Sequence, residues 1–196
     1  MAAATTANIK PEENVNGPRR NLSGQVAIVT GGGKNLGALI AYQLAQLGAK
    51  IVIHYNSDSS RKESEETAEK IKLLPGAVEP LLIQADLTKV SQVESLFVQA
   101  KEHFGRVDIA INSSGVLIKK PIIQLTEEDI DLSIAVNTKL AFFFIQQAGI
   151  HLNDGGRICS ILTSLLAGFT PFYSAYAGTK APVEHFTRAA AKEFGA

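Results

Sequence analysis

The sequence predicts an α/β protein built on a doubly wound parallel sheet in a single domain. Three observations support this fold class. Short β-branched runs alternate with longer amphipathic stretches, those stretches are long enough for helices, and a glycine-rich turn joins the first run to the first helix. Strands that alternate with such helices form βαβ units, whose right-handed crossovers place helices on both faces of the sheet. No linker or repeat divides the 196 residues.

The predicted strands are short apolar runs rich in Val and Ile. The first, VAIVT at residues 26–30, is apolar almost throughout, as expected for a strand that is buried on both faces. KIVIHY at 50–55 follows the first predicted helix. In chain order, the predicted strands cover residues 26–30, 50–55, 78–86, 107–115 (with its exit loop) and 156–162.

The predicted helices carry apolar residues at helical spacing and end at recognisable stop signals. In the first, leucines such as Leu36 and Leu44 share one face, and Gly48 ends the helix. The second is highly charged and ends before Pro75. The third has an apolar stripe that includes Phe97. In chain order, the predicted helices cover residues 36–48, 59–74, 91–105, 127–151 and 174–194.

Composition narrows the class of protein. Apolar residues make up 45% of the chain, and the formal net charge is zero, which gives no support for a nucleic-acid-binding surface. The single cysteine, Cys159, cannot form an intrachain disulfide. No apolar run approaches the roughly 20 residues that cross a bilayer. We expect no metal site, because no zinc-ligand spacing is present among the scattered histidines His54, His103, His151 and His185.

Residues 1–21 are polar and lack the apolar segment of a secretory signal. We interpret them as a flexible tail that precedes one domain at residues 22–196. In the absence of an export signal, the expected location is cytoplasmic.

The turn TGGGKNLG at residues 30–37 lies between the first strand and the first helix, where a Rossmann unit binds pyrophosphate. The spacing G-x-G-x-x-G does not fit, because Leu36 occupies its last position. The spacing T-G-x-x-x-G-x-G fits, with Asn35 at the middle glycine position. Asn is the non-glycine residue that best tolerates left-handed backbone angles. The turn therefore predicts a dinucleotide site.

The end of the second strand favours NADPH over NADH. A site for NADH usually has an acidic residue there for the ribose 2′-hydroxyl, but this strand ends in Tyr55, and Asp58 lies further on. Lys34 in the glycine turn is positioned to meet a 2′-phosphate. Asn56, Ser57 and Arg61 are candidates to assist it.

Taken together, these motifs resemble those of the short-chain dehydrogenase/reductase family, and the resemblance covers residues 22–196. Besides the glycine turn, ADLT at 85–88 resembles the aspartate motif on the adenine side, and NSSG at 112–115 resembles the loop after the fourth strand with two substitutions. VNTKLAFFF at 136–144 resembles the helix of the catalytic asparagine, and YAGTK at 176–180 resembles the Y-x-x-x-K core.

The resemblance implies NADP as cofactor and a set of cofactor-binding residues around the predicted carboxyl edge of the sheet. These residues are Gly31, Gly33, Lys34, Asn35, Leu36, Gly37, Tyr55, Asn56, Ser57, Asp86, Leu87, Asn112, Ser113, Ser114, Gly115, Tyr176 and Lys180.

Tyr176 and Lys180 are four residues apart and so share one face of a helix. Ketone reduction needs a proton donor and a group that holds the oxygen while negative charge builds. A phenol with an ordinary pKa of about 10 is a weak acid at neutral pH, and a nearby ammonium favours its phenolate. The pair therefore predicts Tyr176 as general acid with Lys180 beside it. The resemblance adds that Lys180 binds the nicotinamide ribose.

The resemblance also implies a serine 12–14 residues before the tyrosine that polarises the carbonyl. Ser164 lies 12 residues before Tyr176 and is our first candidate, with Thr163 as the alternative. Asn137 is implied to hold a water molecule on a proton relay to Lys180. The catalytic set is thus Asn137, Ser164, Tyr176 and Lys180.

Within the family, the chain looks most like the NADPH-dependent hydroxynaphthalene reductases and 3-oxoacyl reductases, which reduce ketones. The resemblance implies a homotetramer or homodimer, and by comparison with the family the chain lacks the last strands of the fold. Two alternatives stay open. One is a non-catalytic NADP-binding protein, and the other is an epimerase or dehydratase on the same scaffold.

Overall fold

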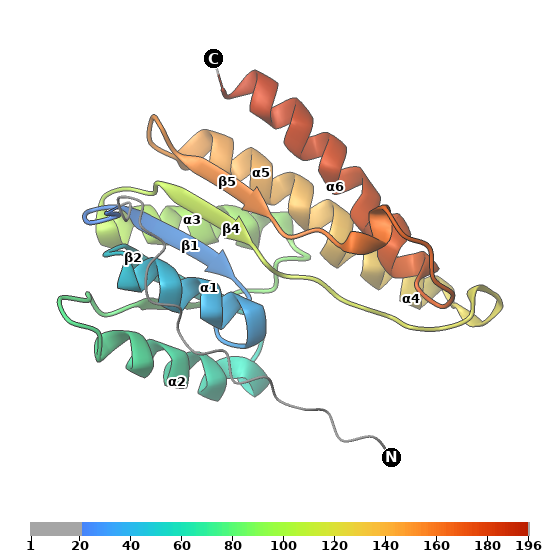
Figure 1. Ribbon diagram of the computed structural model, residues 1–196, viewed down its shortest axis with the longest axis horizontal. Helices are drawn as coiled ribbons and strands as arrows, with labels where there is room; N and C mark the ends of the chain where they lie inside the picture. Colours follow the sequence, from blue (N-terminus) through green and yellow to red (C-terminus); the bar gives the residue numbers. More distant parts are fainter. Residues whose placement is uncertain (1–20, 196) are drawn as a thin grey trace.

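A computed structural model of the chain describes residues 21–195, so most of the predicted tail at 1–21 lies outside the described residues. The five strands form one parallel sheet in the order β3-β2-β1-β4-β5 (Figure 1). This order places the first strand at the centre, as in a Rossmann sheet. The strands are β1 Val26–Thr30, β2 Lys50–Tyr55, β3 Leu81–Gln84, β4 Ile109–Asn112 and β5 Arg157–Ser160.

Six α-helices and four short helical segments connect and follow the strands among residues 21–195. The α-helices are α1 Asn35–Gln46, α2 Arg61–Lys72, α3 Val90–Phe104, α4 Glu127–Ser133, α5 Leu140–His151 and α6 Ser174–Glu193. The short segments are η1 Asp58–Ser60, η2 Ile122–Gln124, η3 Ile134–Lys139 and η4 Ser164–Leu166.

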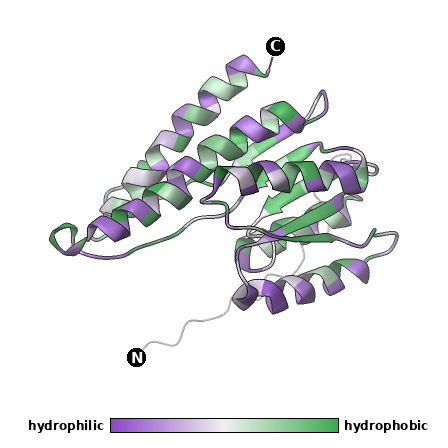
Figure 2. Ribbon diagram, turned by 180° about the vertical axis from the view of Figure 1, so that it is seen from behind, coloured by the Kyte–Doolittle hydropathy of each residue, from purple (hydrophilic) through white to green (hydrophobic). Residues whose placement is uncertain are grey.

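Helices cover both faces of the sheet, which confirms the predicted doubly wound arrangement. Alternate residues of β1 point to opposite faces, so Val26 and Ile28 pack under α3 and α5 while Ala27 and Val29 pack under α1 and α2. Phe97 of α3 and Phe144 of α5 are fully buried in the first of these cores. Figure 2 shows green strands between helices whose outer surfaces carry purple, most clearly along α2.

Several predicted elements differ from the structure at their ends, and two of them differ most. The strand expected at 78–86 is shortened to Leu81–Gln84, because Pro80 has no N–H to donate to the ladder and pairing with β2 begins at Leu81. The helix expected at 127–151 is continuous but contains a π-helical segment, η3, between α4 and α5. Such segments are rare and occur frequently at functional sites.

One carboxylate joins the amino ends of β1 and β4. Asp108 is buried, accepts the Val26 N–H at 2.9 Å and pairs with Arg106 at 2.6 Å. Burial alone would raise the pKa of Asp108. The hydrogen bonds from Arg106 and the Val26 N–H outweigh that effect, so the pKa lies below its ordinary value. The contact fixes the register of the two central strands at the edge opposite the glycine turn.

We expect Asp108→Ala to lower the free energy of unfolding by about 2 kcal/mol or more, because it leaves the buried Val26 N–H without an acceptor. Urea denaturation measures this change. Asp154→Ala, at an exposed position before β5, serves as the matched control and should shift the unfolding midpoint far less. Equal effects of the two substitutions would contradict this role of Asp108.

Candidate active site

Because all five strands are parallel, the loops after their carboxyl ends meet at one edge of the sheet, where open α/β sheets bind ligands. A cavity of about 660 Å³ lies at this edge. Its walls come from the glycine turn after β1, the loops after β2, β3 and β4, and the segment from α4 to the start of α5.

The glycine turn has the backbone that the sequence predicts. Asn35 adopts a φ of 50°, in the left-handed region where Asn is tolerated, and Gly31 has a φ of 61°. A Cβ at Gly37 would overlap the carbonyl oxygen of Gly31, and a Cβ at Gly33 would overlap Ser64 on α2. Gly37 therefore allows a close approach of α1 to the turn, as a pyrophosphate-binding turn requires, and Gly33 allows a close approach of α2.

The amino end of α1 lines this cavity and has no acidic residue of its own. Its first turn contains no Asp or Glu, and its N-cap, Lys34, makes no side-chain capping bond. The first N–H groups of a helix have no partner within the helix, and together with the helix dipole they favour an anion. The turn and the helix end thus suit the phosphates of a dinucleotide.

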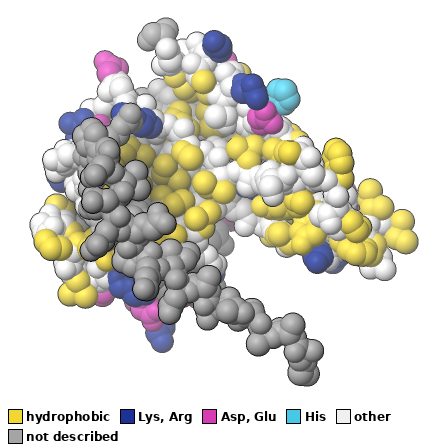
Figure 3. Space-filling model, viewed as in Figure 1, with side chains coloured by type: hydrophobic (Ala, Val, Ile, Leu, Met, Phe, Trp, Pro, Cys, Tyr) yellow, Lys and Arg dark blue, Asp and Glu magenta, His cyan; other side chains and the backbone are white. Residues whose placement is uncertain are grey.

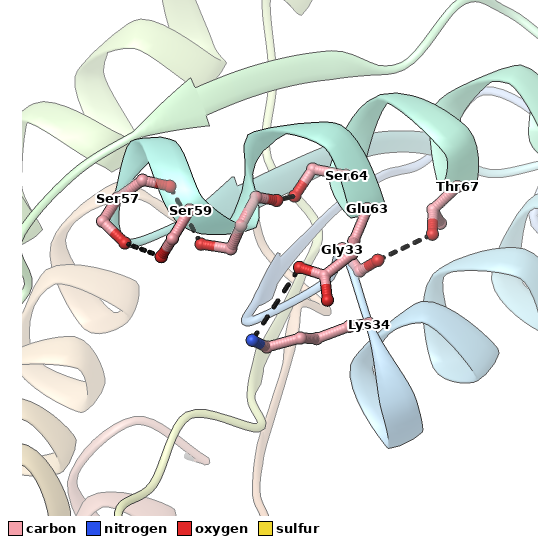
Figure 4. Close-up of polar contacts among 8 residues, drawn as sticks. Gly33, Lys34, Ser57, Ser59, Glu63, Ser64 and Thr67 are labelled. Carbon is pink, nitrogen blue, oxygen red and sulfur yellow. Dashed lines mark hydrogen bonds and ion pairs between the residues drawn. The ribbon is translucent and has the colours of Figure 1, made fainter.

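Ser59 and Ser60 of η1 and Ser64 of α2 line the cavity, and Figure 4 shows polar contacts in this region. Thr67 donates to the carbonyl oxygen of Gly33 at 2.8 Å and so ties α2 to the glycine turn. The Lys34 ammonium lies 3.9 Å from the Glu63 carboxylate, and both side chains are about half exposed. An exposed pair at this distance is weak. Lys34 is therefore available to a more strongly charged anion.

The loop after β3 is held by hydrogen bonds of Asp86. Asp86 accepts from the backbone N–H and the hydroxyl of Thr88, and its N–H donates to Gln92. The Thr88 hydroxyl is the main cause that holds the pKa of Asp86 below its ordinary value. Asp86 and the buried Leu87 both line the cavity, on the side predicted to receive the adenine.

The loop after β4 is bonded directly to the end of β1. The Thr30 hydroxyl donates to Asn112 and accepts from the N–H groups of Ser113 and Ser114. Asn112 is thereby committed to this buried contact and does not line the cavity, whereas Ser113, Ser114 and Gly115 do. Thr30 was not among the predicted site residues, although it begins the glycine motif.

His54 of β2 was not among the predicted site residues. It is buried and lines the cavity. Its Nδ1 accepts the Gly31 N–H at 3.1 Å, and its Nε2 lies 2.8 Å from the carbonyl oxygen of Ala85. The side chain therefore links the turn after β1 to the loop after β3.

Lys180, Asn137 and Gly115 converge beside this cavity. The Lys180 side chain is buried, and its ammonium donates to the carbonyl oxygens of Ile161 at 2.9 Å and Ser114 at 3.5 Å. Burial lowers the pKa of Lys180. A Cβ at Gly115 would lie 3.3 Å from both the Asn137 Oδ1 and the Lys180 Nζ. The tertiary structure thus brings together two predicted catalytic positions that are 43 residues apart in the sequence.

Asn137 lies within η3 and is fully buried. Its amide nitrogen donates to the Val116 carbonyl and to the Thr179 hydroxyl, and its Oδ1 accepts the Val116 N–H. These bonds fix the side chain between the loop after β4 and α6. The Oδ1 retains one further acceptor position, which suits a bound water molecule.

Tyr176 lies one helical turn before Lys180 on α6 and is partly buried. The two candidate hydroxyls lie after β5, at the start of η4. Thr163 is partly buried, and its oxygen accepts the Leu165 N–H at 3.3 Å, which leaves its hydroxyl proton free to donate elsewhere. Ser164 is exposed and makes no side-chain hydrogen bond to another described residue.

Most predicted cofactor-binding residues line the cavity; Asn112, Tyr176 and Lys180 lie outside its lining. The lining also includes residues that the sequence reasoning missed, namely His54, Ser59, Ser60, Ser64, Thr88, Leu132, Val136 and Leu140. Proximity to the end of β2 was a usable signal for the serines. The sequence contained no usable signal for Leu132, Val136 and Leu140. Apolar residues at helical spacing can face either a cavity or the hydrophobic core.

Among residues 21–195, no three His, Cys, Asp or Glu side chains gather in a way that could hold a metal ion. Across the same part of the chain, no helix combines the length and the apolar character that crossing a membrane requires.

A family model described as enoyl-(acyl carrier protein) reductase matches residues 31–196. A hydroxynaphthalene reductase-like protein Arp2 of Metarhizium brunneum is 42% identical over 178 residues, which cover 90% of this chain and 65% of the relative. The hydroxynaphthalene reductase arp2 of Aspergillus fumigatus is 41% identical and is covered to 62%. The chain therefore spans less than two thirds of the length of these relatives.

Solved structures agree with the fold. A structure from Burkholderia cenocepacia, described as a dehydrogenase with bound NADP, is 52% identical with a TM-score of 0.86, and the match covers 90% of this chain and 66% of that chain. A short chain dehydrogenase from Burkholderia cenocepacia J2315 in complex with NADP is 32% identical with a TM-score of 0.84, and 70% of it is covered. Since the family match runs from the glycine turn through the tyrosine–lysine helix, the chain belongs to the short-chain dehydrogenase/reductase family.

Proposed function

We propose that this chain provides the cofactor-binding and catalytic part of an NADPH-dependent ketone reductase. The observation that carries the proposal is the buried Lys180 ammonium, which lies beside Asn137 and Gly115 at the carboxyl edge of the sheet, one helical turn from Tyr176. A buried ammonium among backbone carbonyls is costly to maintain and is a frequent feature of functional sites.

The residues around the cavity fit NADPH. The glycine turn and the amino end of α1 suit the pyrophosphate, and Asp86 and Leu87 would border the adenine. The buried Tyr55 stands where an acid would otherwise select NADH, and Lys34, Asn56 and Ser57 line the rim where the 2′-phosphate would lie. Relatives whose structures contain NADP or NADPH support the same choice.

Bound NADPH would supply the hydride that reduces the carbonyl carbon of the substrate. The Tyr176 hydroxyl would donate its proton to the carbonyl oxygen, so that ketone, hydride and proton together give the alcohol. The Lys180 ammonium would stabilise the phenolate that remains on Tyr176. Asn137 would hold the water molecule through which a proton returns.

A hydroxyl after β5 would polarise the carbonyl. Both Ser164 and Thr163 remain candidates, because Ser164 is accessible while Thr163 has an oriented oxygen with a free hydroxyl proton.

We propose that the substrate is an aromatic ketone. A second cavity, of about 440 Å³, lies between η2 and the start of α6, and it has an apolar and aromatic lining that includes Leu165, Phe172 and Tyr173. The names of the hydroxynaphthalene reductases are consistent with such a substrate.

Tyr176→Phe should reduce kcat for ketone reduction by roughly 100- to 10,000-fold, because the substrate oxygen loses its proton donor. NADPH oxidation at its absorbance band measures the rate across a panel of aromatic ketones. Tyr42→Phe, at a partly buried tyrosine on α1, is the matched control and should keep the wild-type rate. Thr163→Ala and Ser164→Ala in the same assay separate the two candidate hydroxyls.

An unchanged rate in Tyr176→Phe would contradict the assigned role of Tyr176. A wild-type protein that binds NADPH but turns over no ketone would instead support a non-catalytic NADP-binding protein.

Lys34→Ala should raise the dissociation constant for NADPH about tenfold while leaving that for NADH nearly unchanged, because only NADPH carries the 2′-phosphate. Fluorescence titration of both dinucleotides measures this difference. Lys62→Ala removes the same charge from an exposed position on α2 and should alter neither constant. An equal loss for NADPH and NADH in Lys34→Ala would show that Lys34 does not select the phosphate.

We also propose a homo-oligomer, a dimer or tetramer, formed through the outer surface of α5 and α6. Phe142 of α5 remains 45% exposed although it packs edge-on against Phe186 of α6, and Ile150 is 63% exposed. Figure 3 shows a further group of hydrophobic side chains on the projecting end of the molecule. Ile123 and Phe169 are also highly exposed. Exposed apolar side chains that gather on one surface are typical of a protein–protein interface.

The cytoplasmic location stays a prediction.

Light scattering on a size-exclusion column should show a dimer or tetramer for the wild-type protein at micromolar concentration. Phe142→Asp should dissociate it, because burying an unpaired carboxylate in an interface is strongly unfavourable. Leu73→Asp, at an exposed leucine after α2, is the control and should leave the oligomer intact. A wild-type monomer at this concentration would contradict the proposal.

A further inference from the structure

We propose that His54 is a positioning residue for the cofactor, whose imidazole holds the phosphate-binding turn against the loop that borders the adenine. This inference rests on the proposed dinucleotide binding. His54 would not act on the substrate. It would set the orientation of the glycine turn before α1. It would also hold this turn at a fixed distance from the loop after β3.

The contacts of His54 assign a role to each ring nitrogen. The Gly31 N–H can only donate, so Nδ1 must be the acceptor at 3.1 Å. The Ala85 carbonyl can only accept, so Nε2 must carry the proton at 2.8 Å. The bridge therefore requires one neutral tautomer, with hydrogen on Nε2.

The surroundings of the ring favour that neutral form. His54 is 3% exposed, and burial lowers its pKa to about 4, in spite of the hydrogen bond to the Ala85 carbonyl, which acts in the opposite direction. A protonated ring would direct a second N–H at the Gly31 N–H and break the bridge. At neutral pH the side chain thus acts as a fixed acceptor and donor and contributes no positive charge to the phosphate site.

The bridge spans three adjacent strands. The backbone of His54 accepts the Gly32 N–H at 3.1 Å, while its side chain accepts the Gly31 N–H and donates beyond β2 to the loop after β3. Gly31 has a left-handed φ of 61°. Glycine adopts positive and negative φ about equally well, so its own preference does not fix this conformation. The bond to Nδ1 therefore helps to determine how the turn is presented to a phosphate.

The loop after β3 depends on the other nitrogen. Ala85 immediately precedes Asp86 and Leu87, which line the cavity on the proposed adenine side. The His54 imidazole thus connects the part of the cavity suited to phosphate with the part suited to adenine. A residue that packed in the same space without hydrogen bonds would fill the core but lose this connection.

Three substitutions at His54 separate the two hydrogen bonds from simple packing. His54→Leu removes both bonds. His54→Asn keeps an acceptor near the Nδ1 position, and His54→Gln keeps a donor near the Nε2 position. We expect the dissociation constant for NADPH, measured by fluorescence titration, to rise about tenfold in His54→Leu, with most of the affinity recovered in His54→Asn. His151→Leu, at a partly buried histidine that stacks on Phe97, is the control and should bind NADPH as the wild type does.

Two measurements on the cofactor-free protein test the bridge independently of binding. Nitrogen-15 chemical shifts of the wild-type imidazole should show the tautomer with hydrogen on Nε2. Amide hydrogen exchange at Gly31 should be slow in the wild type and in His54→Asn, and faster in His54→Leu and His54→Gln.

Wild-type affinity for NADPH in a folded His54→Leu protein would overturn the inference. A wild-type ring found with hydrogen on Nδ1, or doubly protonated at neutral pH, would overturn it even if His54→Leu failed to fold. If the wild-type protein bound no NADPH while the tautomer and the exchange pattern matched expectation, the proposed function would fail and the bridge itself would stand.

Discussion

Parallel pairing of β1 with both β2 and β4 is the constraint on which the rest of this structure depends. The pairing aligns Val29 with Ile53 and Ile111, so the chain leaves all three strands at the same level and in the same direction. Each strand must then be followed by a loop at one edge of the sheet and a helix that returns to the other edge. Apolar residues on both faces of the strands hold this arrangement, and the proposed dinucleotide site lies where these strands end and their loops gather.

The gathered loops bring many buried polar groups together, and most of these groups form hydrogen bonds with one another. Thr30, Asn112 and the serines after β4 form one such network, and Asn137 with Val116 and Thr179 forms another. Buried polar groups that are fully hydrogen-bonded fix a single geometry, whereas unpaired ones are costly. These hydrogen bonds fix the geometry of this edge before any ligand binds, as the proposed function requires.

Most residues proposed to bind the cofactor lie in the loops around the large cavity, whereas Asn137, Tyr176 and Lys180 lie in η3 and α6. The glycine turn, His54 and the loop after β3 form walls of the large cavity. Lys180 and Asn137 lie beside Gly115, which also lines it, and Tyr176 lies one helical turn before Lys180 on α6. The π-helical segment η3 places Asn137 between the loop after β4 and α6. A π-helical turn contains more residues than an α-helical turn. In a regular α-helix, the residues after η3 would therefore face a different direction. This segment is thus a local departure from ideal geometry that serves the site.

The sequence by itself determined the fold class, the succession of strands and helices along the chain, and the left-handed backbone of Asn35. These features depend on apolar periodicity and backbone preferences, which act over a few neighbouring residues. It also indicated Tyr176 and Lys180 by their spacing within one helix. Only the tertiary structure decided that Asn112 is committed to Thr30, that Lys180 is buried against Ile161 and Ser114, and that His54 faces Gly31. Those contacts join residues from separate strands and helices. The parallel sheet decides which loops meet at one edge and therefore which residues become partners. No local pattern in the sequence shows that these residues lie close together.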